Sequence, residues 1–250
     1  MSSVLADIWS IMRFYGRNIV RNTAQNLVSC WRSVARTLAE HYRYERPLGI
    51  RTTGYVYRRK KGEQANPFRD DVLYEPTGYG QLEQVAALVR PGPGDVVMDF
   101  GCGKGRAVAF FATKGVAKSM GVEFRAELAA VARENAARLV GRTSPVEILV
   151  GDFLEVDLDS VTLFFMYNPA GEKTLKVLAA RMGESLARRP RPIRLAYVFP
   201  ICAQLFDDCP FLARLPAAEG VKDIAVWVGG AGSGAGEGAP GGSASGPATR

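Results

Sequence analysis

From about Asp70 to Val228, short apolar runs alternate with longer stretches in which apolar residues recur at helical spacing. This alternation is typical of α/β domains, because the chain between two parallel strands has to cross the sheet, usually as a helix. The pattern therefore predicts a mostly parallel sheet with helices packed on it. It restricts the fold of this chain more than any other feature of the sequence.

The apolar runs place the individual elements. Strands are expected at 96–100, 119–123, 146–151, 161–167, 193–199, 211–216 and 224–228. Helices are expected near 78–89, 105–114, 125–140, 171–188 and 201–206. The last two strands would form a hairpin that adds an antiparallel edge to the sheet.

Two segments that flank this domain, residues 70–228, differ from it in composition. Residues 1–69 hold 13 Lys and Arg against 4 Asp and Glu, a net charge of +9, whereas the rest of the chain carries −2. Apolar residues at helical spacing over 4–38 predict one long or two shorter amphipathic helices, followed by a basic connector over 43–69. Residues 229–250 are almost all Gly, Ala, Ser and Pro, which predicts a disordered tail.

Composition also bears on partners and location. The basic N-terminal segment can meet an anionic partner such as nucleic acid or a membrane surface, dock on its own protein, or remain a solvated helix face. No apolar run reaches the ~20 residues that cross a bilayer. We expect a cytoplasmic protein, at most peripheral at a membrane, and the four cysteines agree because they form no Cys-x-x-Cys pair: Cys30, Cys102, Cys202 and Cys209.

A glycine-rich turn follows the first expected strand, in the run Asp99-Phe100-Gly101-Cys102-Gly103-Lys104-Gly105. Glycines at such a turn let the backbone approach a ligand, and the amides at the start of the next helix can bind it. A P-loop would need Ser or Thr at Gly105, and a Gly-x-Gly-x-x-Gly dinucleotide loop would need glycine at Arg106. Both phosphate-binding interpretations are disfavoured, and the Asp-x-Gly-x-Gly-x-Gly spacing remains.

This spacing resembles motif I of the class I methyltransferases, and the ends of the next three strands match that family in order. The resemblance implies a Rossmann-like, mostly parallel seven-stranded sheet with helices on both faces, an N-terminal helical extension, and S-adenosyl-L-methionine as cofactor. It implies that Glu123 binds the ribose and that Asp152 and Phe153 bind the adenine. The full set of implied cofactor-binding residues is Tyr79, Asp99, Gly101, Cys102, Gly103, Gly105, Glu123, Asp152, Phe153 and Asn168. Each acid taken singly can also serve as a turn or helix cap.

Tyr167, Asn168 and Pro169 end the fourth expected strand, where the family keeps residues beside the reactive methyl group, and are the candidate catalytic residues. Together with Ala170 they resemble the Asn/Asp-Pro-Pro-aromatic loop of amino-methyltransferases, without its second proline and its aromatic residue. Upstream, residues 74–80 resemble the Tyr-Glu-Pro-x-x-Tyr-Gly loop of the non-SET histone-lysine methyltransferases, which covers the methionine end of the cofactor. In the alternative interpretation, Pro76 and Thr77 only cap the next helix.

The resemblance implies an enzyme that methylates an unidentified acceptor, which can be a protein, a nucleic acid or a small molecule. N-methylation of a protein lysine or another amine is favoured over a small-molecule O- or N-methyltransferase and over a non-catalytic RNA- or membrane-binding module on the same fold. Methyl transfer needs no catalytic triad, because the cofactor supplies the electrophile. We expect no metal site, because a chain with a single histidine cannot form a multi-histidine site. The single histidine, His41, is interpreted as an exposed linker residue, and Lys104 as a solvated side chain rather than a partner of the cofactor carboxylate.

Overall fold

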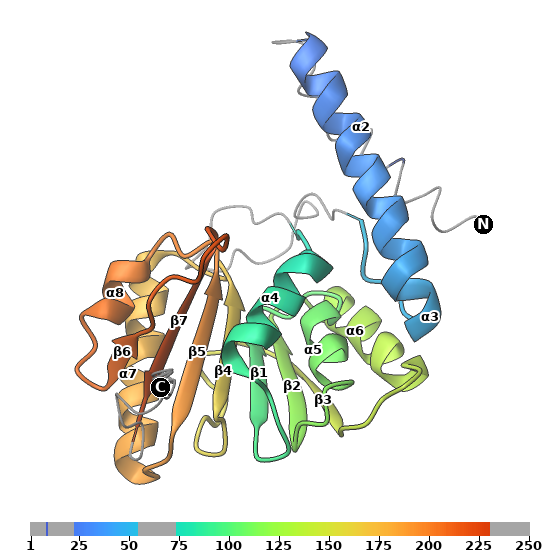
Figure 1. The fold of residues 1–250 in the computed structure, drawn as a ribbon. Helices are drawn as coiled ribbons and strands as arrows, with labels where there is room; N and C mark the ends of the chain where they lie inside the picture. The colour runs from blue at the N-terminus through green and yellow to red at the C-terminus, as the bar shows by residue number, and fades with distance from the viewer. Residues whose placement is uncertain (1–8, 10–22, 55–73, 231–250) are drawn as a thin grey trace, which may run out of the picture.

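The computed structural model describes residues 9, 23–54 and 74–230, and its centre is a seven-stranded sheet (Figure 1). The strand order is β3-β2-β1-β4-β5-β7-β6. Strands β1 to β5 run parallel, whereas β7 is antiparallel to both β5 and β6. The strands are β1 (Val96–Phe100), β2 (Lys118–Glu123), β3 (Val146–Val150), β4 (Leu163–Tyr167), β5 (Ile193–Val198), β6 (Leu212–Arg214) and β7 (Ile224–Gly229).

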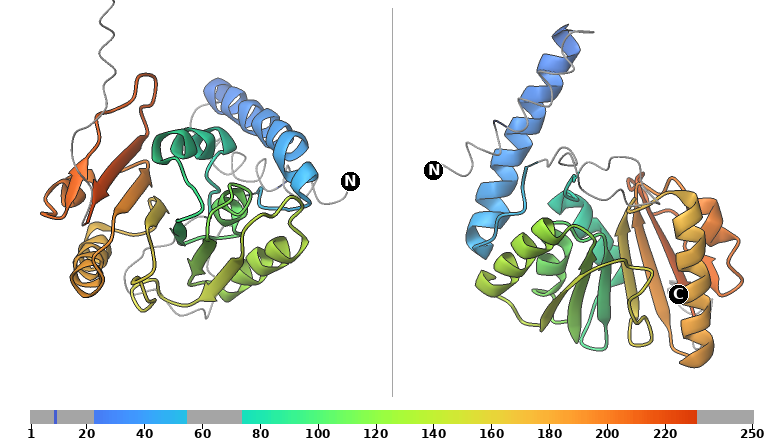
Figure 2. Two further views of the ribbon diagram at one scale, coloured as in Figure 1. Left: turned by 60° about the horizontal axis from the view of Figure 1, so that its bottom comes forward. Right: turned by 180° about the vertical axis from the view of Figure 1, so that it is seen from behind.

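Helices cover both faces of the sheet, as the end-on view in Figure 2 shows. The central strands are apolar on both sides: Met98 and Phe100 pack with α7, whereas Val97, which precedes Met98, packs with α4 and α5. Such strands read as continuous apolar runs because neither face meets water. The helices are α4 (Tyr79–Val89), α5 (Arg106–Phe111), α6 (Ala126–Arg138), α7 (Glu172–Arg188) and α8 (Ala203–Asp207).

The strand order reverses between β1 and β4. The chain winds from β1 outward to β3, then returns to place β4 on the other side of β1. In open parallel sheets, ligands bind beyond the carboxyl ends of the strands at such a reversal, because the loops on the two sides diverge there. Both the glycine-rich turn after β1 and Asn168 after β4 lie at this point.

The structure confirms the α/β fold class, and every expected strand and helix of the 70–228 segment is present with only its ends moved by a few residues. It also confirms the antiparallel edge, and it places β7 rather than β6 beside β5. The N-cap of α4 is Gly78, not Pro76 or Thr77. The domain limits at 69 and 228 stay predictions, and the predicted tail falls, from residue 231 on, outside the described residues.

An N-terminal helix packs against this domain and then projects away from it (Figure 1). It consists of α2 (Thr23–Glu40), a π-helical turn η2 (His41–Glu45) and α3 (Arg46–Leu48), and it ends at Gly49 in the left-handed conformation. The helix predicted over 4–38 is present from Thr23, and the part before residue 23, Trp9 excepted, lies outside the described residues. The prediction for His41 is wrong: this residue lies in η2, half-buried, with Nδ1 3.6 Å from Glu45 Oε2.

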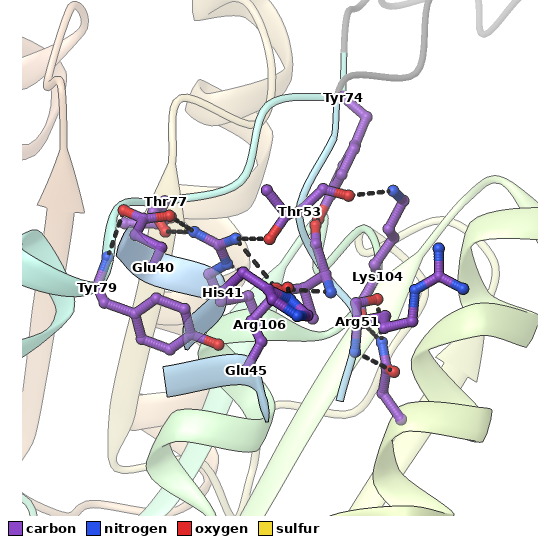
Figure 3. A network of polar contacts seen from close by, with 12 residues as sticks. Glu40, His41, Glu45, Arg51, Thr53, Tyr74, Thr77, Tyr79, Lys104 and Arg106 are labelled. Atoms are coloured by element: carbon purple, nitrogen blue, oxygen red, sulfur yellow. Dashed lines mark hydrogen bonds and ion pairs between the residues drawn. The ribbon is translucent and has the colours of Figure 1, made fainter. Parts of the chain in front are cut away.

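The π-helical turn aims two carboxylates at one arginine of the domain. A π turn bonds residues five apart, so Glu40 and Glu45 come to the same side, which a regular α-helix would not achieve. Glu40 Oε2 lies 2.7 Å from Arg106 Nη1 and Glu45 Oε1 lies 3.2 Å from Arg106 Nη2 (Figure 3). Only 2% of the Arg106 side chain and 1% of Glu45 are exposed. The helix is therefore held by a buried ion-pair cluster that begins at the first residue of α5.

The chain that follows completes the contacts of Arg106. Its guanidinium also donates to the hydroxyls of Thr52 and Thr53 and to the carbonyl of Thr77. Burial raises the pKa of Glu45, but the charge of Arg106 and the hydrogen bonds of Thr52 and Thr53 outweigh burial and hold that pKa below its usual value. Residues 43–54 of the predicted connector are thus packed against the domain. In the described part of the chain, no helix is long and apolar enough to cross a membrane.

Replacing Arg106 with Met should destabilise the protein by about 3–5 kcal/mol, because two carboxylates lose their partner in a buried site. Denaturant unfolding of both proteins measures the difference. The matched control is Arg188→Met, which removes an exposed arginine paired with Asp159 and should change the free energy of unfolding little. Equal effects of the two substitutions would contradict the role of the cluster.

Candidate active site

The turn after β1 is built from three glycines in the left-handed conformation. Gly101, Gly103 and Gly105 have φ angles of 77°, 54° and 79°. Side chains with a Cβ rarely adopt these angles, so the sequence pattern has a direct conformational cause. The amides of Gly101 and Cys102 both donate to the carbonyl of Val122 on β2, which holds the turn against the neighbouring strand.

Glu123, at the end of β2, joins this turn directly. Its Oε2 accepts from the amide of Gly103 at 2.8 Å, and its Oε1 accepts from the amide of Arg125 at 2.9 Å. Each carboxylate oxygen has two lone pairs, so both can accept a further hydrogen bond from a ligand. Burial, and then the charge of Glu123, raise the pKa of Asp99 to about 8. Asp99 and Glu123 are both nearly buried, and the raised pKa means that the folded protein keeps a proton on Asp99 near neutral pH. A cationic ligand at the turn would favour the ionised form of this acid, so the pair of acids suits a cation.

Asp152 and Phe153 follow β3 beside this site. Asp152 Oδ1 accepts from the amide of Leu154 at 2.8 Å, which fixes a local turn. The ring of Phe153 lies 5.6 Å from that of Phe100, centroid to centroid, and both Asp152 and Phe153 are half-buried. An acid and an aromatic ring thus stand at the end of the strand next to β2.

On the other side of the reversal, the segment after β4 meets the glycine turn. A Cβ placed on Gly101 would lie 3.4 Å from Cβ of Pro169, so the two loops are in contact. Asn168 is itself left-handed, with φ 43°, and its Oδ1 accepts from the Tyr197 hydroxyl at 3.0 Å. The structure therefore brings together the two halves of the predicted site, including Tyr167, which precedes Asn168 and is half-buried.

Tyr74 covers the turn. A Cβ on Gly103 would lie only 2.1 Å from the ring of Tyr74, so the ring rests directly on the glycine. The Tyr74 hydroxyl donates to the carbonyl of Thr52, and Lys104 Nζ donates to the carbonyl of Thr53 at 2.8 Å (Figure 3). The prediction of a solvated Lys104 is thus wrong, because its ammonium group ties the turn to the segment after the N-terminal helix.

Two other predicted residues turn their side chains elsewhere. Tyr79 is fully buried, stacked on Tyr44 with centroids 4.3 Å apart and contacted by the Arg106 guanidinium 4.6 Å from its centroid. The side chain of Cys102 packs in a cluster with α5 and α6, and burial raises the pKa of its thiol well above the usual value. The backbone of Cys102 still forms part of the turn. Among the described residues, no group of three His, Cys, Asp or Glu side chains is arranged to hold a metal ion.

Sequence reasoning missed Arg106 and Tyr197. A signal for Arg106 existed: it is the first residue of a helix whose other residues are all apolar, where a cation is disfavoured by the helix dipole and needs acidic partners. Tyr197 had no such signal, because its ring is buried among apolar side chains and only the pairing of β4 with β5 brings its hydroxyl to Asn168.

Comparisons with known proteins agree with this geometry. Residues 97–186 match the family model of a methyltransferase domain. A protein-lysine N-methyltransferase of Saccharolobus islandicus is 33% identical over 115 residues, which make up 42% of this chain and 71% of that protein. This chain belongs to the class I S-adenosylmethionine-dependent methyltransferases.

Solved structures are also similar to this methyltransferase. An RNA methyltransferase from Salinibacter ruber in complex with S-adenosyl-L-homocysteine aligns with a TM-score of 0.44 and 21% identity, over 62% of this chain and 93% of that one. A SAM-dependent O-methyltransferase from Thermotoga maritima aligns with a TM-score of 0.46 and 20% identity, over 62% of this chain and 66% of that one.

The residues around the turn fit the cofactor of this family, S-adenosyl-L-methionine. When bound, this molecule supplies an electrophilic methyl group on a sulfonium. Its sulfonium and ammonium are cations, and the methyltransferase presents two nearly buried acids, Asp99 and Glu123, at the turn. The glycines keep the turn free of Cβ atoms, since a Cβ on Gly103 would overlap Tyr74 and one on Gly101 would contact Pro169.

Gly103→Ala should abolish cofactor binding, because the added Cβ overlaps the Tyr74 ring. The expected result is loss of the rise in melting temperature that S-adenosylhomocysteine gives the wild type. The control is Gly115→Ala, which has a similar φ of 69° but no atom within 4 Å of the added Cβ. In the double variant Tyr74→Ala Gly103→Ala the overlap is removed, so the melting temperature without ligand should recover relative to Gly103→Ala alone. A normal rise with Gly103→Ala alone would show that the turn is not the binding site.

Asp99→Asn should make the protein more stable at high pH. Because the folded-state pKa of Asp99 is raised to about 8 from 3.8, the folded protein keeps a proton that the unfolded chain has lost, and the free energy of unfolding falls as pH rises through this window. The substitution removes that fall, worth at most about 6 kcal/mol at about 1.4 kcal/mol per pKa unit.

Melting temperatures from pH 4 to pH 9 measure this effect. The gain of Asp99→Asn over the wild type should grow up to about pH 8 and then stay constant. Asp159→Asn is the control: hydrogen bonding to Arg188 lowers the pKa of the half-buried Asp159 to about 2, so the effect of this substitution changes only below about pH 4 and should stay constant over the measured range. A gain for Asp99→Asn that does not change with pH would contradict a raised pKa.

Proposed function

We propose that this methyltransferase transfers the methyl group to an amine, specifically the side chain of a protein lysine. The observation that carries the proposal is the 33% identity to a protein-lysine N-methyltransferase over 71% of that protein's length. The position of Tyr167-Asn168-Pro169 beside the glycine turn supports it, because a side-chain amide and backbone carbonyls there can accept hydrogen bonds from an amine nitrogen.

Roles for the cofactor-binding residues follow from their positions. Glu123 would accept hydrogen bonds from the ribose hydroxyls, and Asp152 would accept one from the adenine amine while Phe153 packs on the ring. Asp99 and the backbone of the turn from Gly101 to Gly105 would hold the methionine end. Tyr79 would act indirectly, by packing against Arg106 behind the turn.

The chain's own contribution to the reaction is orientation. The acceptor amine would have to be neutral, because an ammonium nitrogen has no lone pair to offer, so the lysine would first release a proton to water. The cofactor would then supply the electrophilic methyl group. Asn168, held by the Tyr197 hydroxyl, would fix the direction of that lone pair. Such positioning accounts for much of the rate in reactions where the cofactor supplies the electrophile.

The exposed side of the N-terminal helix is proposed to recruit an anionic partner or a membrane surface. Trp31 is 71% and Tyr42 59% exposed there, and the exposed charged residues between Trp31 and Arg46 are all basic. Aromatic residues interleaved with arginines suit a negatively charged surface. A cytoplasmic location stays a prediction.

Labelled S-adenosylmethionine incubated with a lysate of the source organism tests the acceptor. Label should enter protein, and acid hydrolysis should release it as methylated lysine. Asn168→Ala should lose at least tenfold in transfer while keeping the melting shift given by S-adenosylhomocysteine, since it acts on the acceptor side.

The other outcomes separate the alternatives. Label in RNA or in small molecules would refute the lysine assignment. A melting shift without any transfer, together with salt-sensitive binding to RNA or anionic vesicles, would favour the non-catalytic binding module. Removal of residues 1–45 would not be a clean test, because it also removes Glu40 and Glu45 from Arg106.

A further inference from the structure

The neighbouring strands β4 and β5 are both followed by a residue with an unfavourable backbone. Asn168 has φ 43° and Phe199 has φ 49°. Among the described residues, only Arg90 is a third non-glycine residue with positive φ. Asparagine adopts this region fairly often, whereas a bulky aromatic residue seldom does. Backbone strain of this kind persists only where surrounding contacts impose it, and it is concentrated at binding sites.

Hydrogen bonds on both sides impose the conformation of Phe199. Its amide donates to the carbonyl of Asp223 at 2.8 Å, and its carbonyl accepts from the amide of Ile201 at 2.8 Å. Despite this strain the ring is not used for the core: 39% of Phe199 is exposed, as is 77% of Ile201. A strained backbone costs free energy of folding, and the half-exposed ring of Phe199 does little to offset that cost. This points to a role for the ring outside the core.

The Phe199 ring lies against Tyr167 at the acceptor side of the site. Their centroids are 5.4 Å apart and the rings meet edge to face at 78°. Tyr167 precedes Asn168, and Pro169 next to it contacts the glycine turn. The aromatic pair therefore stands on the β5 side of Asn168, and the glycine turn stands on the β1 side.

We propose that Phe199 and Tyr167 form an aromatic wall that receives the acceptor side chain. This inference rests on the proposed function and names the acceptor contact within it. A lysine has a long apolar stem and an ammonium head, and aromatic rings suit both, since they pack against methylenes and attract cations. Neither residue would take part in the chemistry. They would hold the stem so that the nitrogen reaches Asn168.

Three substitutions at Phe199 test the wall. Phe199→Leu keeps an apolar side chain but removes the ring, Phe199→Ala removes most of the side chain, and Phe199→Tyr keeps the ring. The measurement is label transfer from S-adenosylmethionine to the protein fraction of a dilution series of the lysate. We expect Leu and Ala to raise the half-saturating lysate concentration at least fivefold and Tyr to leave it within twofold. Val177→Ala, at an exposed apolar residue on α7, is the control and should change nothing.

The melting shift given by S-adenosylhomocysteine distinguishes a loss of acceptor binding from a loss of cofactor binding. All variants should keep the shift, since Phe199 follows β5, and β4 stands between β5 and the strand that carries the glycine turn. The aromatic-wall proposal would be overturned if Phe199→Leu lost the melting shift, or if its half-saturating lysate concentration equalled that of the wild type. Label in RNA or small molecules would refute the lysine function, and an unchanged Phe199→Leu response for that labelled fraction would then refute the wall as well.

Discussion

The buried guanidinium of Arg106 is the interaction on which the arrangement of this methyltransferase depends. It opens α5 directly after the glycine turn, and both Glu40 and Glu45 of the N-terminal helix pair with it. A cation cannot stay in the interior without such partners, because the loss of hydration is not otherwise offset. The residue that follows the glycine turn thus requires the N-terminal helix to be in place.

This cluster makes the active site a composite of distant segments. Tyr74 rests on Gly103, and the carbonyls of Thr52 and Thr53 bind Tyr74 and Lys104. The segment that follows the N-terminal helix is therefore part of the wall around the glycine turn. A partner that binds the exposed basic side of that helix would act on a structure that is mechanically connected to the cofactor turn.

The sheet and half of the site follow from local sequence. Strands buried on both faces have to be apolar, so the central strands β1, β4 and β5 were recognisable as runs. Left-handed turns require glycine, so Gly101, Gly103 and Gly105 were recognisable as a loop. The contacts of Arg106 and the edge-to-face pair of Tyr167 with Phe199 could not be recognised in the sequence. They join residues that lie far apart along the chain, and no spacing pattern links these residue types.

The sequence by itself determined the order of strands and helices, the glycine turn and the acids at the ends of the strands, since each depends on residues within one element or its immediate turn. Only the tertiary structure decided that Tyr74 rather than Tyr79 lies on the turn and that the basic N-terminal segment is tied to the domain by its acids. It also decided that Tyr197 meets Asn168 and that Phe199 meets Tyr167. These depend on which elements become neighbours, and that is set by packing and by the pairing of buried charges.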